Sequence, residues 1–162
     1  MDNKPKLKIG WFSFTCCEDS TILLTELLNK HLEDWKKVID FQHFKALKTN
    51  NSIEGLDVAF VEGAISSEIQ AAELEKIRTN CKYLIAIGAC ACTGQPSCSR
   101  NEFLPEDINY KIAFYMSHFD YSKEVKKIAD FVKVDDEVTG CPMNPDQFIE
   151  MVGKYLKLFN IA

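Results

Sequence analysis

Apolar and amphipathic segments alternate along the first half of this chain, and their order limits the folds that it can adopt. Four apolar runs have the length of a strand, and two segments between them have apolar residues at helical spacing. The expected strands are residues 7–14, 38–44, 56–61 and 83–87, and the expected helices are residues 20–32 and 67–80. Because right-handed crossovers return each helix onto the sheet, this order predicts a parallel sheet with helices on both faces.

The second half of the chain is less regular. We expect short strands at residues 112–115 and 132–134, a helix at 122–131 and a closing helix at 145–158. No repeat or linker divides the 162 residues, and a hydrophobic content of 46% is enough for one core. We therefore expect a single domain over residues 1–162, of the α/β class, with a flavodoxin-like doubly wound sheet.

Charge and hydropathy exclude several classes of partner. The chain has 24 acidic and 19 basic residues and a net charge of -5, with no basic stripe among aromatic residues, so nucleic acid is not an expected partner. No apolar stretch approaches the roughly 20 residues that cross a bilayer, and the start of the sequence does not resemble a signal peptide. We expect a cytoplasmic protein that reaches a membrane only through its partners.

Seven cysteines are unusual for a chain with these properties. An odd number without a secretion signal favours metal ligation or redox chemistry over a disulfide scaffold. Cys16 and Cys17 follow the first expected strand, Glu62 and Gly63 follow the third, and Cys90 follows the fourth. Since ligands of doubly wound sheets collect beyond the carboxyl ends of the strands, we expect these loops to converge there.

Four of these cysteines form a candidate ligand set for an iron-sulfur cluster. A [4Fe-4S] cluster needs four thiolates, and Cys16, Cys17 and Cys90 supply three of them at strand ends. Cys141 supplies a fourth, between Gly140 and Pro142, which favour a tight turn. A single cysteine at a strand end is commonly a core residue, but an adjacent pair with two glycine-flanked cysteines favours a cluster. The paired Cys-x-x-Cys knuckles that zinc usually takes are absent.

Four motifs between Gly10 and Pro145 carry a resemblance to a known family. The chain has, in this order, Gly10-Trp11-Phe12-Ser13-Phe14-Thr15-Cys16-Cys17, Val61-Glu62-Gly63-Ala64-Ile65, Ile87-Gly88-Ala89-Cys90-Ala91-Cys92-Thr93-Gly94 and Gly140-Cys141-Pro142-Met143-Asn144-Pro145. Together they resemble the cluster domain that nickel-iron hydrogenase small subunits share with the corresponding complex I subunit.

The resemblance implies an electron-transfer subunit with one [4Fe-4S] cluster, held by Cys16, Cys17, Cys90 and Cys141. It implies an obligate large subunit that holds the nickel-iron centre, and further iron-sulfur or flavin subunits that exchange electrons with the cluster. On this expectation the chain is part of an oxidoreductase complex but has no catalytic residue and does no bond chemistry itself.

The motifs divide between two branches of that family. The hydrogenase branch usually has a Cys-x-x-Cys here, which would require a cysteine at Ser20, and the complex I branch has an adjacent pair like Cys16 and Cys17. The Glu62-Ile65 motif and the Cys92-Asn101 stretch are more similar to soluble hydrogenases. We therefore expect a soluble nickel-iron hydrogenase subunit, with a complex-I-related subunit as the alternative. A lone flavodoxin-like module with unliganded cysteines is a third hypothesis.

Several further residues are candidates for supporting roles. The residues expected beside the cluster or at a subunit interface are Glu62, Gly63, Gly88, Cys92, Gly140 and Pro142. Glu62 could contact the large subunit or move protons, or it could cap the start of a helix. Cys92 and Cys98 lie close to Cys90 in the sequence and could be alternative ligands or could stabilise the cluster from behind its ligands, but we favour spectators because four better-placed thiols exist; Cys81 is expected to be a core residue.

The histidines and the loop after the first strand suggest no further cofactor site, and one later loop is a candidate docking segment. The three histidines have no spacing that suggests metal binding, and no glycine-rich phosphate loop follows the first strand, which disfavours flavin binding by this chain. Arg100 and Asn101 could dock the large subunit, or they could belong to an ordinary surface loop.

Overall fold

The computed structural model describes residues 5–103 and 109–161, and it contains one five-stranded parallel sheet with the strand order β2-β1-β3-β4-β5. All strand pairings in this sheet are parallel. The strands are β1 (Leu7–Ser13), β2 (Ile39–Phe44), β3 (Leu56–Glu62), β4 (Cys81–Ile87) and β5 (Asp136–Val138). The doubly wound parallel sheet expected from the sequence is thus confirmed.

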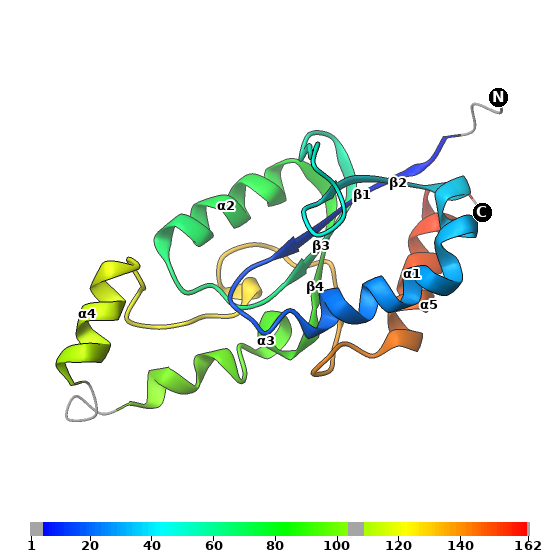
Figure 1. The fold of residues 1–162 in the computed structure, drawn as a ribbon. Helices are drawn as coiled ribbons and strands as arrows, with labels where there is room; N and C mark the ends of the chain where they lie inside the picture. Colours follow the sequence, from blue (N-terminus) through cyan, green and yellow to red (C-terminus); the bar gives the residue numbers. More distant parts are fainter. Residues whose placement is uncertain (1–4, 104–108, 162) are drawn as a thin grey trace.

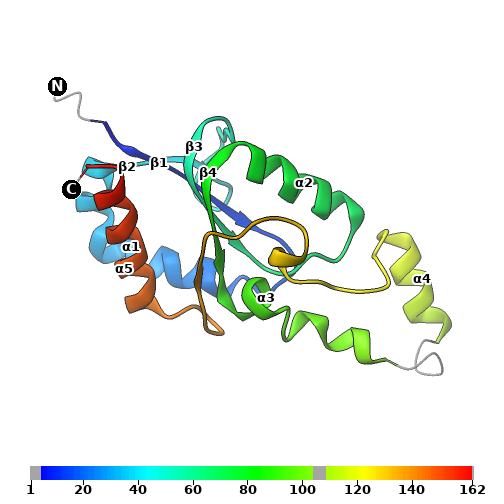
Figure 2. The ribbon, with the colours of Figure 1, turned by 180° about the vertical axis from the view of Figure 1, so that it is seen from behind.

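Helices cover both faces of this sheet (Figures 1 and 2). On one face lie α1 (Asp19–Val38) and α5 (Pro145–Leu158), and on the other lies α2 (Glu68–Thr79). The shorter elements are α3 (Gly88–Thr93), η1 (Ser97–Glu102), α4 (Tyr110–His118) and η3 (Ile128–Asp130). Within the described part of the chain, no helix is both long and apolar enough to span a membrane.

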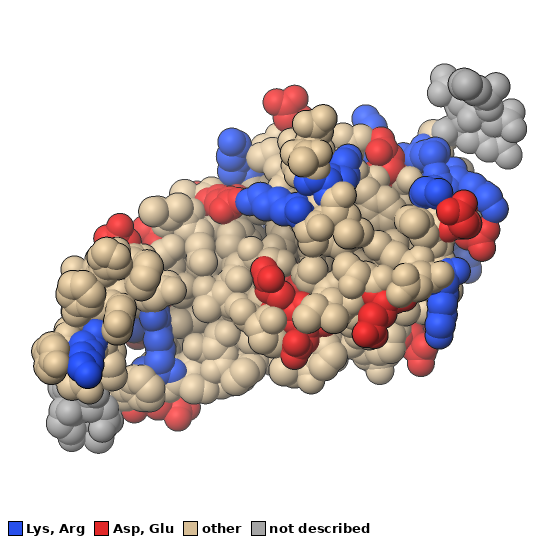
Figure 3. Space-filling model, viewed as in Figure 1, with Lys and Arg blue, Asp and Glu red and all other residues tan. Residues whose placement is uncertain are grey.

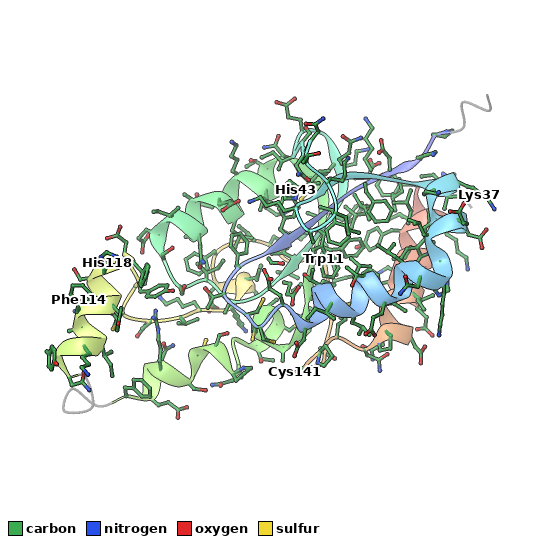
Figure 4. All side chains as sticks on the ribbon, in the orientation of Figure 1. Trp11, Lys37, His43, Phe114, His118 and Cys141 are labelled. Carbon is green, nitrogen blue, oxygen red and sulfur yellow. The ribbon has the colours of Figure 1, made fainter. Side chains whose placement is uncertain are left out.

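Alternate residues of the central strand β3 serve the two cores. Phe60 faces α1 and α5, where its ring lies 5.2 Å from that of Phe148, whereas Val61 faces α2. Trp11 of β1 also meets Phe148 edge to face at 5.8 Å (Figure 4). All seven residues of β3 are buried, as expected of a strand that is covered on both faces. This packing fixes the carboxyl ends of β1, β3 and β4 relative to one another.

The closing helix at 145–158 is confirmed, but three other expectations for the second half are wrong. Residues 112–115 lie in α4 because the Asn109 side chain accepts from the backbone N–H groups of Lys111 and Ile112 and begins a helix there.

The expected helix at 122–131 is mostly extended chain that pairs with residues 65 and 66, and only η3 is helical. The expected strand at 132–134 is a bend that precedes β5.

One segment leaves the layered body of the protein. We call the described residues 97–103 and 109–121 the arm. They include η1 and α4, and they run out from the end of α3 and return towards β5. In Figures 1 and 2, α4 stands away from the sheet and from the helices that cover it. No residue of α4 is buried, so this helix is not part of either core.

Candidate cluster-binding site

Four cysteines from three segments of the chain line one depression beyond the carboxyl ends of β1, β3 and β4. Cys16 and Cys17 lie in the turn between β1 and α1, Cys90 lies in α3, and Cys141 lies in the turn between β5 and α5. The other lining residues are Asp19, Ser20, Glu62, Gly63, Ile87, Gly88, Ala89, Gly140 and Pro142. The structure therefore brings together the four cysteines that the sequence suggested as ligands. We call this depression the mouth.

The four thiols differ in their exposure. Cys90 is buried and Cys16 is partly buried, whereas Cys17 and Cys141 are exposed. The Ser97 hydroxyl lies 3.3 Å from the Sγ atom of Cys90 and can donate to it. Figure 4 shows Cys141 at the lower edge of the molecule, in the turn that leads into α5. The ligand set thus has an inner pair and an outer pair of sulfur atoms.

Local electrostatics keep the first two thiols protonated in the free chain. Burial, together with the negative charge of Glu62, raises the pKa of Cys16 to about 12. For Cys17, a hydrogen bond from the Asp19 backbone N–H favours the thiolate, but partial burial and the Asp19 carboxylate outweigh it and raise the pKa. A thiol must lose its proton to bind iron, so binding of a cationic group here would release protons.

Two glycines allow the backbone to come close enough to form the mouth. Gly140 has a φ of 121°, and a Cβ atom at this position would collide with the carbonyl oxygen of Pro142. Its carbonyl oxygen accepts a 2.7 Å hydrogen bond from the Ala89 N–H, which ties the Cys141 turn to the Cys90 turn. Gly63 has a φ of 93° and packs against the backbone of Phe14. Left-handed backbone of this kind is readily adopted only by glycine.

A buried polar network supports the mouth from behind. Glu62 is 3% exposed, and its carboxylate accepts from the Thr21 hydroxyl at 2.6 Å and from the Ser20 N–H at 3.2 Å. The Thr21 hydroxyl oxygen in turn accepts from the Trp11 indole N–H at 2.7 Å. Burial raises the pKa of Glu62. The contacts of Glu62 within this chain are therefore those of a residue that caps the first turn of α1.

Ser20 and Ser97 complete the support of the mouth. The Ser20 hydroxyl accepts from the N–H of Met143 at 3.2 Å and so links α1 to the turn that carries Cys141. The Ser97 hydroxyl also lies 3.1 Å from the carbonyl oxygen of Thr15, and its single proton can be donated either to that oxygen or to the Cys90 sulfur. Sequence reasoning missed Ser20, Thr21 and Ser97 as supporting residues. Their only signal was the placement of small polar residues a few positions after Cys17 and Cys90, which is too common to be informative.

Of the remaining cysteines, Cys81 and Cys92 lie away from the mouth, whereas Cys98 packs against the small buried cluster that includes Cys90. Cys92 is buried in the core on the α2 side, where its Sγ atom lies 3.6 Å from the carbonyl oxygen of Ala86, and burial raises its pKa to about 12. The Cys98 thiol donates to the carbonyl oxygen of Val125 at 2.9 Å. Cys81 begins β4, at the opposite end of that strand from Cys90. Cys92, named above as a supporting residue, thus does not line the mouth.

The donor set fits a multi-iron cluster better than a single metal ion. Within residues 5–103 and 109–161, no three His, Cys, Asp or Glu side chains are close enough together to hold one ion. In a four-iron cluster each thiolate binds a different iron, so the ligands surround the cluster rather than meet at one point. The enclosed cavity between them is about 20 Å³, and Cys17 and Cys141 lie exposed at its opening.

This fold and this site define a class of protein: a doubly wound α/β domain that gathers cysteines at the carboxyl ends of its strands. Comparison with known sequences is more specific. The family described as "NADH ubiquinone oxidoreductase, 20 Kd subunit" matches residues 16–155. The chain belongs to this family, which confirms the resemblance seen in the four motifs.

Individual relatives include hydrogenase subunits. Sulfhydrogenase 2 subunit delta of Pyrococcus furiosus is 28% identical over 151 residues, which cover 90% of this chain and 60% of that protein. NAD-reducing hydrogenase HoxS subunit delta of Cupriavidus necator is 32% identical over 110 residues, covering 59% of this chain and 53% of that protein. The chain therefore spans little more than half the length of these relatives.

A solved structure supports the fold. A chain in the crystal structure of NAD+-reducing [NiFe]-hydrogenase in the H2-reduced state superposes with a TM-score of 0.80 at 19% identity. The match covers 94% of this chain and 92% of that chain. At this identity the likeness shows that the two chains share a fold.

Proposed function

We propose that this chain is the electron-transfer small subunit of a nickel-iron hydrogenase, with one [4Fe-4S] cluster bound by Cys16, Cys17, Cys90 and Cys141. The observation that carries the proposal is the arrangement of these four cysteines, from two turns and helix α3, around one depression. Membership of the family and the names of the relatives support it. On this proposal the described residues form one domain built around the cluster.

The residues of this chain hold and surround the cluster rather than carry out bond chemistry. When bound, the cluster accepts and passes on one electron at a time. Soft thiolate ligands suit iron-sulfur clusters, and the buried Cys90 and half-buried Cys16 would hold the inner side away from water. The Ser97 hydroxyl next to Cys90 would donate to its sulfur, and hydrogen bonds of this kind tune the cluster potential.

The exposed outer side of the mouth is expected to be buried by another protein. Cys17 and Cys141 are exposed in the isolated chain, so a cluster that they hold would face solvent unless another protein packs over it. We assign this cover to a large subunit that holds the nickel-iron centre. Electrons would pass on to a further iron-sulfur or flavin subunit, and the assembly would be cytoplasmic.

A second candidate function remains open because of the adjacent cysteines. The pair Cys16-Cys17 is the arrangement of the complex I branch, and the family description names an NADH ubiquinone oxidoreductase subunit. On this alternative the chain would carry the same cluster but would pair with a large subunit that lacks nickel. The two functions differ in the metal content of the partner and not in this chain.

Anaerobic purification of the complex tests the proposal. We expect about four irons and four sulfides per chain, an EPR signal from the reduced cluster, and nickel in a co-purifying subunit. Iron without nickel would favour the complex-I-related function. A colourless chain that cannot be reconstituted with iron and sulfide would refute the cluster and favour a flavodoxin-like module with unliganded cysteines.

A further inference from the structure

The arm presents an unusual concentration of exposed aromatic side chains. On α4, Phe114 is 60% exposed and Tyr115 is 56% exposed. The other large apolar residues exposed on the arm or facing it from α2 are Ile69, Phe103, Tyr110, Phe119 and Tyr121. Figure 4 shows the Phe114 and His118 side chains on α4, far from the sheet. Exposed apolar patches of this kind commonly mark protein interfaces.

A groove separates the arm from the body of the protein. It has a volume of about 1040 Å³, and its lining is mostly apolar. It runs between the N-terminal end of α2 and the inner side of α4, and is lined by Glu68, Ile69, Phe103, Ala113, Met116, Ser117, Asp120, Tyr121, Ser122 and Lys123. Figure 3 shows mostly uncharged atoms over this end of the molecule. Phe114 and Tyr115 are not among the residues that line this groove.

The base of the arm is firmly tied to the body. The Arg100 guanidinium donates to the carbonyl oxygen of Ser122 at 2.7 Å and lies 5.2 Å from the ring of Tyr121. The side chain of Asn101 accepts from the N–H of Val125 at 2.8 Å and donates to its carbonyl oxygen at 2.7 Å. These contacts hold the outgoing and returning segments together. The residues considered above for docking thus position the arm.

The arm is continuous with the mouth. Its first residue, Ser97, contacts both the Cys90 sulfur and the carbonyl oxygen of Thr15, just before Cys16. A protein that covers the mouth would therefore lie next to the start of the arm. The net charge of -5 and the mixed charges at the rim of the groove give no attraction to nucleic acid or to an anionic membrane.

We propose that the arm is a second docking surface for the large subunit that covers the mouth, and that the exposed aromatic side chains of α4 form this surface. This inference rests on the proposed function. The mouth and the arm would then form one continuous interface. The aromatic side chains of α4 would supply the apolar anchors that dominate binding, while the mouth aligns the cluster with its partner.

A double variant of α4 tests this inference in the assembled complex. We expect Phe114→Ser/Tyr115→Ser to weaken binding of the nickel-containing subunit by at least tenfold, since buried aromatic anchors commonly contribute that much. Iron and sulfide per chain should not change. The matched control is Leu32→Ser/Leu158→Ser, which removes two exposed apolar side chains from the helices of the other face and should leave binding unchanged.

Hydrogen exchange gives a second readout. Backbone amides of α4 should exchange more slowly in the complex than in the iron-loaded chain alone. Wild-type binding by the α4 variant, or unchanged exchange of α4, would overturn the docking site while leaving the proposed function intact. A homodimer of the isolated chain that the α4 variant disrupts would assign the aromatic surface of α4 to a second copy instead. A chain without iron, or a partner without nickel, would refute the hydrogenase function itself and the inference that rests on it.

Discussion

The mouth and the arm begin at the same edge of the sheet but use their side chains in opposite ways. At the mouth, Glu62, Thr21 and Trp11 form hydrogen bonds with one another in the interior, and the cysteines are positioned by backbone that this interior supports. On the arm, α4 has no buried residue, and its aromatic rings contact one another and not the core. The interior residues that stabilise the fold therefore also position the mouth, whereas the exposed side chains of α4 do not contribute to the core.

The largest expected effect is the loss of the cluster when a cysteine of the mouth is removed. Cys16→Ala should reduce iron from about four atoms per chain to a small fraction of that, because each thiolate holds a different iron. Cys81→Ala is the control, since Cys81 begins β4 at the other end of the sheet and should retain full iron. Iron and sulfide analysis of anaerobically reconstituted chains measures both. Full iron in Cys16→Ala would remove Cys16 from the ligand set.

The network behind the mouth should contribute strongly to stability. Thr21→Val removes a hydroxyl that pairs with both the Glu62 carboxylate and the Trp11 N–H. Because both partners stay buried and lose a hydrogen bond, we expect a loss of about 2–4 kcal/mol in the free energy of unfolding.

Thr25→Val is the matched control, because the Thr25 hydroxyl is exposed and donates only within α1. Its effect should be within about 0.5 kcal/mol. Urea unfolding of the iron-free chains compares the two variants, and equal midpoints would show that the network does not support the mouth.

A smaller loss is expected when the turn before Cys141 is altered. Gly140→Ala places a Cβ atom against the Pro142 carbonyl oxygen at a φ of 121°, which should cost about 1–3 kcal/mol and reduce iron occupancy. Gly153→Ala lies in α5 with open space around it and should stabilise the chain by about 0.5–1 kcal/mol. Thermal unfolding and iron analysis test the pair. A Gly140→Ala chain as stable as the wild type would show that this turn can relax.

The two regions also differ in how far the sequence predicted them. Cys16, Cys17 and Cys90 were placed correctly at strand ends because alternating apolar segments specify a parallel sheet, and such a sheet brings those ends together. The closing helix was predicted over the right residues, and the structure shows the local signals that specify it, since Asn144 caps it and Pro145 begins it.

The arm was not predicted, for a physical reason. Residues 112–115 read as a strand because Phe114 and Tyr115 favour β structure, and local pattern alone does not show that these rings remain exposed. The Asn109 cap that begins α4 was a weaker signal than the aromatic residues after it. Likewise, residues 122–131 were expected to be a helix. No local signal reveals that they pair with residues 65 and 66, which precede α2 in the sequence.

The smallest expected effect on the free energy of unfolding comes from substitutions on the arm, and an unchanged stability is the informative result. In the isolated chain, Phe114→Ser/Tyr115→Ser should change the free energy of unfolding by less than about 0.5 kcal/mol, since both rings are already more than half exposed. Phe148→Ala, which removes a ring from the core between Trp11 and Phe60, should cost about 3–5 kcal/mol. Urea titration of both variants gives the two values.

If the α4 variant were as destabilising as a core variant, the aromatic rings would be serving the fold, and the contrast between the arm and the mouth would fail. If its stability is unchanged, folding cannot account for the apolar surface of α4. Exposed aromatic residues promote aggregation, so a neutral result would mean that the arm bears this risk without any gain in stability. The benefit of these side chains would then lie in an interface, which is the role that their exposure and the continuity of the arm with Cys90 assign to them.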